Sequence, residues 1–111
     1  ILLMSQVKIS EIEDAPIEGS GKRVFFEHPY TTLKYELALF QVEGKYYAIT
    51  DRCAICGASL GRVPNLQGMF ASCSGQECLW NIKRGVCKFD RTSVMPTYKV
   101  AAREDGLYID I

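Results

Sequence analysis

Five cysteines are the residues most able to do chemistry in this chain of 111 residues, and four of them form two short groups. Two residues separate Cys53 from Cys56, and sixteen residues separate Cys56 from Cys73. Four residues separate Cys73 from Cys78. A two-residue spacer lets two thiolates from one turn bind the same ion, and four soft thiolates suit zinc or an iron–sulfur cluster. The pattern therefore predicts a metal centre with these four cysteines as ligands.

Other interpretations of the cysteines stay open. A zinc ribbon has a two-residue spacer in both groups, whereas four residues separate Cys73 from Cys78. Free cysteines also pack as small hydrophobic residues, but four of them in two glycine-rich loops are poorly explained in that way. The fifth, Cys87, is interpreted as a packed thiol and as a substitute ligand if Cys78 points away. Because no secretory signal is evident, we favour metal binding over disulfides and expect a cytoplasmic location.

The elements that must position these loops carry mainly strand patterns, and helical periodicity is weak. Alternation and β-branched or aromatic residues predict strands at 7–9, 24–27, 35–42, 46–49, 69–72, 80–82, 99–103 and 107–111. Tight hairpins are predicted at 43–44 and 104–107, and a short helical turn capped by Ser10 at 10–15. The fold class is therefore all-β, an antiparallel sandwich or small barrel, with 53–88 forming two loops that are each followed by a strand.

Length and charge limit the function classes. The length suits a single domain. Thirteen basic residues balance thirteen acidic ones, which argues against nucleic acid or an anionic membrane as the main partner. The apolar runs are far shorter than the roughly 20 residues that span a bilayer, so no membrane insertion is expected.

The cysteine loops and their flanks resemble the Rieske [2Fe–2S] domain family over most of the chain. Residues 51–61 resemble the first family box, C-x-H followed shortly by Gly-Ala-x-Leu. Residues 73–85 resemble the second, C-x-x-H followed by an aromatic, a polar turn and Gly, and the spacing between the boxes lies in the family's range. The segments 39–49, 95–100 and 104–109 are also family-like. The resemblance implies one Rieske-like domain over 1–111, with a cluster-binding subdomain at about 51–96.

Both histidine positions of the family are changed in this chain. Ile55 stands at the first and Gln76 at the second, and isoleucine cannot bind metal while Gln76 offers only a weak carbonyl oxygen. Cys56 lies one residue after the first position and Cys78 two residues after the second, so a modest loop shift could bring both sulfurs into place. The resemblance thus implies a four-thiolate [2Fe–2S] cluster on Cys53, Cys56, Cys73 and Cys78.

The function implied by the resemblance is one-electron transfer by a ferredoxin, a non-catalytic carrier or redox component of an oxidoreductase system. Its partner would be a reductase or an oxygenase, by analogy with the family. Thiolates in place of two neutral imidazoles add two negative charges, so we expect a reduction potential near roughly −400 mV. The pH dependence that titrating histidine ligands produce is expected to vanish.

Two other functions fit the same residues. One is a structural zinc module for protein interaction, which would be colourless and without redox chemistry. The other is a Rieske-like accessory subunit without a metal, of the nitrite reductase small-subunit type, in which the histidines are also missing. The survival of two cysteines at Rieske positions and two more beside the vacant positions argues against the second.

Several other residues have modest predicted roles. His28, the only histidine, is interpreted as a surface or turn residue, and Trp80 as a core aromatic. The hydroxyls of Ser72 and Ser74 could donate to cluster sulfur, and the role of an ordinary loop serine fits both residues equally well. A basic group after the second box could steer an acidic redox partner; it comprises Lys83, Arg84 and Lys88.

Overall fold

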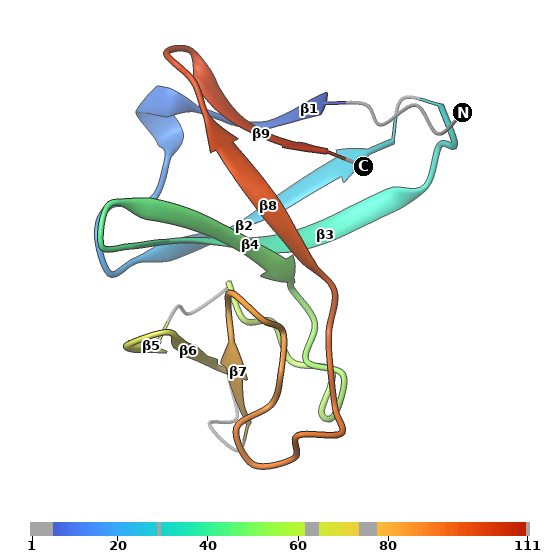
Figure 1. Ribbon diagram of the computed structural model, residues 1–111. Helices are drawn as coiled ribbons and strands as arrows, with labels where there is room; N and C mark the ends of the chain where they lie inside the picture. Colours follow the sequence, from blue (N-terminus) through green and yellow to red (C-terminus); the bar gives the residue numbers. More distant parts are fainter. Residues whose placement is uncertain (1–5, 29, 62–64, 74–77, 111) are drawn as a thin grey trace.

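The computed structural model describes residues 6–28, 30–61, 65–73 and 78–110, and within them the chain is all-β, as the sequence predicts (Figure 1). The described elements are β1 (Gln6–Glu11), η1 (a 3-10 helix, Ile12–Asp14), β2 (Gly21–Glu27), β3 (Lys34–Val42), β4 (Lys45–Thr50), β5 (Leu66–Gln67), β6 (Phe70–Ser72), β7 (Leu79–Asn81), β8 (Thr97–Ala102) and β9 (Gly106–Asp110). No helix in these described ranges is long and apolar enough to cross a bilayer.

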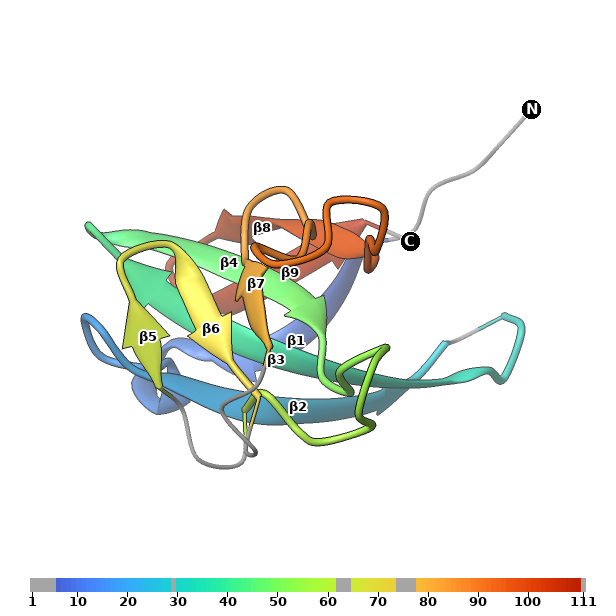
Figure 2. The same cartoon turned by 90° about the horizontal axis from the view of Figure 1, so that it is seen from below.

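Two antiparallel sheets make up the fold. The larger has six strands in the order β1-β9-β8-β4-β3-β2, and the smaller has three in the order β5-β6-β7. The edge strands of the larger sheet approach each other, since Lys22 Nζ of β2 donates to Ser10 Oγ of β1 over 2.8 Å. The larger sheet therefore curls into a nearly closed barrel, and the smaller sheet lies against one side of it (Figures 1 and 2).

Strand β3 joins the two hydrophobic cores because successive side chains of a strand point to opposite faces. Leu37 and Leu39 pack inside the barrel. Ala38 and Phe40 pack with the core beneath the smaller sheet, where Trp80 is fully buried. Burial on both faces explains why residues 37–40 of this strand are continuously apolar rather than alternating. The smaller sheet is thereby anchored to the barrel by β3.

The turn between β3 and β4 is the tight hairpin that the sequence predicts. Glu43 and Gly44 have φ of 54° and 75°, the left-handed conformation that a two-residue turn of this hand requires. Glutamate rarely adopts it, and here the carboxylate of Glu18 accepts hydrogen bonds from the N–H of Glu43 (2.6 Å) and of Gly44 (2.8 Å). A remote side chain thus holds the turn that fixes the β3–β4 register.

Two sequence-based predictions differ from the structure. The helical turn is shorter than predicted and lacks the Ser10 cap, because Ser10 lies within β1 and its hydroxyl donates to the carbonyl of Glu11. Strand β5 was not predicted, since two residues are too few to show a periodic pattern. Neither difference moves the cysteine loops.

Candidate metal centre

The first cysteine loop follows β4 and is closed by its own backbone. The N–H of Cys53 donates to the carbonyl of Ala58, and the N–H of Gly57 donates back to the carbonyl of Cys53, both over 2.8 Å. Gly57 has a φ of 77°, a conformation that is costly for residues with a side chain. This conformation lets the chain reverse direction after Cys56. The loop is therefore a compact turn that presents Cys53 and Cys56 on the same side.

The second pair of cysteines flanks the connection between β6 and β7. Cys73 directly follows β6 and Cys78 directly precedes β7, and the N–H of Cys73 donates to the carbonyl of Cys78 over 3.1 Å. The β-ladder thus holds the two residues opposite each other. Residues 74–77 lie outside the described residues, and with them the predicted roles of Gln76 and Ser74.

The two loops bring four sulfur atoms together. The Sγ atoms of Cys53, Cys56, Cys73 and Cys78 all lie within 4.8 Å of one another. Cys53, Cys73 and Cys78 are buried, while Cys56 is exposed. The structure therefore assembles all four residues that the sequence singles out, two from the first loop and two from the base of the connection between β6 and β7.

The pKa values of these thiols depend on burial, on nearby hydrogen-bond donors and on the closeness of the other sulfurs. Burial raises the pKa of Cys53, but hydrogen bonds from the N–H groups of Cys56 and Ile55 and from the indole of Trp80 outweigh burial and lower this pKa to about 7. Burial and the sulfurs of Cys53 and Cys73 raise the pKa of Cys78 strongly. The sulfurs resist simultaneous ionisation, so a bound cation is what would make a full set of thiolates favourable.

Cys56 shows the same conflict at the surface. The N–H of Ala58 lowers its pKa, but burial and the neighbouring sulfurs of Cys53 and Cys73 raise it overall. A metal ion would reverse the effect of those neighbours, since it converts mutual repulsion of thiolates into shared attraction.

A hydrogen bond from Trp80 to the site was not predicted. Its Nε1 lies 3.2 Å from Sγ of Cys53 and donates to it in the buried core. The sequence indicated only a packing role, because the sequence pattern around a buried tryptophan does not show which acceptor its indole N–H will meet. Trp80 therefore both fills the core and stabilises a thiolate.

Of the two roles predicted for Ser72, donation to cluster sulfur is wrong. Its hydroxyl donates to the carbonyl of Cys73 over 3.0 Å rather than to sulfur, because the side chain of a residue adjacent to Cys73 along the strand points to the opposite face. Ser72 supports the backbone of the loop instead.

Asp51 is a second residue that sequence reasoning missed. Its carboxylate is fully buried and accepts hydrogen bonds from the Ser59 hydroxyl and from the N–H of Gly61, with Arg23 Nε of β2 at 3.3 Å. It thus ties both ends of the first cysteine loop to the barrel. An aspartate after a strand is so common in turns that its position in the sequence does not distinguish it.

The remaining candidate ligands lie outside the sulfur group. Cys87 is buried in the core beside Trp80 but is not one of the four mutually close sulfurs. His28 lies in the turn between β2 and β3, where its Nδ1 accepts the N–H of Tyr30 and of Thr31. It is a turn residue as expected, although it is buried rather than at the surface.

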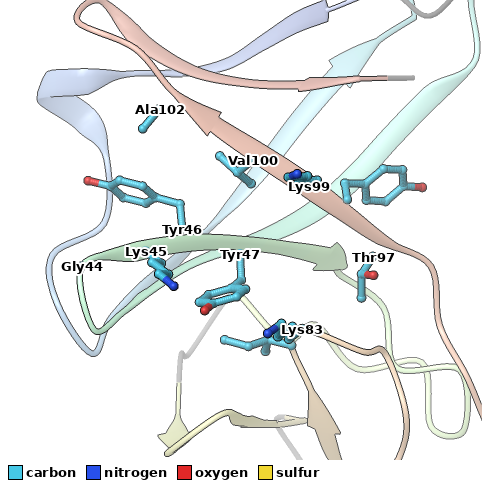
Figure 3. A pocket seen from close by; sticks show the side chains of 11 residues that line it. Gly44, Lys45, Tyr46, Tyr47, Lys83, Thr97, Lys99, Val100 and Ala102 are labelled. Carbon is cyan, nitrogen blue, oxygen red and sulfur yellow. The ribbon is translucent and has the colours of Figure 1, made fainter.

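A cationic cleft lies between the two sheets, apart from the sulfurs. It has a volume of about 510 Å³, and Lys45, Lys83 and Lys99 line it together with Tyr46 and Tyr47. In Figure 3 the Tyr47 ring points from β4 toward Lys83, while Tyr46 lies on the other side of the strand. None of its described lining residues is a cysteine, so it is a separate surface feature.

Comparison with known proteins places this arrangement in context. No family model matches the chain. The 3-phenylpropionate/cinnamic acid dioxygenase ferredoxin subunit of Photorhabdus laumondii is 26% identical over 110 residues, 97% of this chain and 96% of the relative. The ferredoxin–oxygenase complex of carbazole 1,9a-dioxygenase contains a chain with a TM-score of 0.73 at 22% identity, covering 94% of this chain and 91% of that one.

The chain has the fold of Rieske-type ferredoxins. The ferredoxin of Sphingomonas yanoikuyae B1 gives a TM-score of 0.74 at 18% identity, over 96% of this chain and 99% of that one. A structure assigned to an NADH-dependent nitrite reductase small subunit from Mycobacterium tuberculosis gives 0.76 at 15%, over 99% and 97%. The likeness to the Rieske ferredoxin fold is confirmed, whereas ligation by four cysteines remains a prediction.

Proposed function

We propose that this chain is a one-electron carrier of an oxidoreductase system, in which iron bound by Cys53, Cys56, Cys73 and Cys78 exchanges electrons with a reductase- or oxygenase-type partner. The observation that carries the proposal is the group of four Sγ atoms within 4.8 Å of one another on a ferredoxin fold. Cysteine thiolates are common ligands of iron in electron-transfer proteins.

The donor set supports iron bound by sulfur alone. The side chain of Ile55, at the first histidine position, is hydrocarbon and 53% exposed, and His28 is engaged in its own turn. Thiolates are the ligands of both an all-cysteine [2Fe–2S] cluster, which the sequence predicts, and a single iron ion bound by four cysteines. Either centre would supply a change of one electron between two oxidation states.

The position of the sulfurs favours exchange with another protein. Cys56 is exposed, so one thiolate reaches the surface while the other three are buried. Lys83 and Arg84 are exposed in the turn after β7, where Asn81 Oδ1 accepts the N–H of each over 2.9 Å. Positive charge on a preformed turn would steer a partner with an acidic face, and the rate of electron transfer should then fall as salt is added.

The known similar proteins support the class of partner. The relative from Photorhabdus laumondii is the ferredoxin subunit of a dioxygenase, and the carbazole dioxygenase structure holds oxidised ferredoxin together with reduced oxygenase. An oxygenase component is therefore the first partner to test for this chain.

Reversible reduction of the iron-loaded protein tests the proposal. The chain is prepared anaerobically, loaded with ferrous iron and followed by visible absorption and protein-film voltammetry. We expect a coloured protein that takes up and releases one electron per chain. A protein that binds no iron, or whose bound iron cannot be cycled, would exclude an electron carrier. The Cys56→Ala variant should lose the signal, whereas Cys87→Ala should keep it.

An accessory subunit without metal is the second candidate, because the nitrite reductase small-subunit structure matches the fold as well as the ferredoxins do. A structural zinc module is the third, since the same four sulfurs would serve it. Metal analysis separates them: the accessory subunit would contain neither iron nor zinc, and the zinc module would bind zinc but show no redox signal when offered iron.

A further inference from the structure

We infer that the four cysteines form a site for one metal ion in tetrahedral thiolate coordination, rather than for a [2Fe–2S] cluster. The inference rests on the metal centre of the proposed function and concerns how many metal atoms this centre holds. It departs from the cluster that the sequence predicts and that the fold suggests.

The first argument is the spacing of the sulfurs. Around one ion with metal–sulfur bonds of about 2.3 Å, tetrahedral sulfurs lie about 3.8 Å apart. In a [2Fe–2S] cluster, thiolates on different irons lie roughly 5 to 6.5 Å apart, because two bridged metal atoms separate them. In this structure no pair among the four Sγ atoms exceeds 4.8 Å. The sulfurs therefore enclose too little space for two irons.

The second argument is which sulfurs are neighbours. All six pairs of the four Sγ atoms lie within 4.8 Å, so the sulfurs of the two loops are not set apart as two separate pairs. A cluster must divide the four cysteines into two pairs, one for each iron. Each of the three possible divisions places four of these six close pairs on different irons. A single ion places no such demand, because all four sulfurs then share one centre.

The third argument is that the backbone fixes the first two sulfurs close together. The N–H groups of Ile55 and Cys56 donate to Sγ of Cys53, and the N–H of Ala58 donates to Sγ of Cys56. These bonds come from one compact turn, closed by the two 2.8 Å bonds between Cys53 and the residues Gly57 and Ala58. The turn therefore holds these two sulfurs close enough to share one metal atom. The turn is thus already formed for one ion.

The test counts metal and sulfide per chain. The full chain is freed of metal under anaerobic conditions and divided into two samples, one given ferrous iron and the other ferrous iron with sulfide. We expect one iron per chain and no acid-labile sulfide in both samples. Two irons with two sulfides per chain, and the spectrum of a binuclear cluster after reduction, would overturn the inference while leaving the electron-carrier proposal intact.

Cobalt(II) provides a readout that does not depend on redox activity. Titration of the metal-free chain should saturate at one equivalent, with the d–d absorption bands of tetrahedral cobalt thiolate. Cys56→Ala changes an exposed side chain and should weaken cobalt binding by about tenfold or more. Cys87→Ala, at a buried position outside the sulfur group, should leave affinity within about twofold of the parent.

The remaining outcomes are equally informative. Saturation at two equivalents, or octahedral bands, would contradict a single tetrahedral site. A chain that binds one zinc or cobalt ion but cannot cycle iron would support this site and refute the proposed electron carrier. A chain that binds no metal at all would refute both.

Discussion

The indole of Trp80 donates a hydrogen bond to Sγ of Cys53 over 3.2 Å, although the two residues are 27 positions apart in the sequence. The bond links the smaller sheet to the first cysteine loop inside the buried core. It is a donor aimed at a sulfur, and a donor of that kind stabilises the thiolate form over the thiol. The residue that packs the core thus also tunes the candidate metal ligand.

Replacing this donor should raise the pKa of Cys53. Trp80→Phe keeps an aromatic ring but removes the N–H, so the pKa, which is about 7 in the parent, should move back toward 9.0. The rise should be roughly 1, because a hydrogen bond contributes about 1 kcal/mol and one pKa unit is about 1.4 kcal/mol. Thiolate absorbance of the metal-free protein against pH measures it, and an unchanged midpoint would show that the bond does not stabilise the thiolate.

The reduction potential of the iron-loaded protein should not change with pH between about 6 and 10. Thiolates bound to metal carry no proton to lose in this range, and Ile55 occupies the position where an imidazole ligand would titrate. Protein-film voltammetry across this range provides the measurement. A midpoint that falls steeply with rising pH would indicate a titrating ligand and contradict coordination by cysteine alone.

Asp51→Asn should destabilise the protein by about 3 kcal/mol, because it removes one partner of a buried ion pair and leaves Arg23 facing a neutral amide. The amide oxygen can still accept from Ser59 and Gly61 at the Oδ1 position, but the amide nitrogen cannot accept the bond that Ser59 Oγ makes to Oδ2 over 2.8 Å. Urea unfolding measures the change. Asp110→Asn, at an exposed position, is the matched control and should stay within about 0.5 kcal/mol of the parent. Equal stability of both variants would show that the pairing of Asp51 with Arg23 and the first cysteine loop does not stabilise the fold.

Gly85→Ala should be among the more damaging single-methyl changes. Gly85 has a φ of 79°, and a Cβ there would lie 2.1 Å from the carbonyl oxygen of Met95, which belongs to backbone that cannot easily yield. Strain and overlap together should cost about 2–4 kcal/mol. Gly68→Ala also has a positive φ, 62°, but meets open space and should cost only about 1 kcal/mol. Thermal unfolding of both variants tests whether the close approach matters beyond the dihedral.

Sequence alone determined the features that depend on local pattern. Apolar, β-branched and aromatic residues and the Glu43–Gly44 turn indicated the strands and the β3–β4 hairpin, because strand composition and turn chemistry are local properties. The types and spacing of Cys53, Cys56, Cys73 and Cys78 were enough to select these residues from five cysteines. Spacing along the chain also indicated that each loop would present two sulfurs.

Only the tertiary structure decided the relations between residues that are distant along the chain. The approach of the two loops, the Trp80 bond to Cys53 and the Asp51 pairing with Arg23 all depend on how β2, β4 and β7 pack together. The same is true of the distances between the sulfur atoms, which favour a site for one metal ion over a site for two. A sequence specifies which donors exist, whereas the distances between them follow from the packing of the strands that carry them.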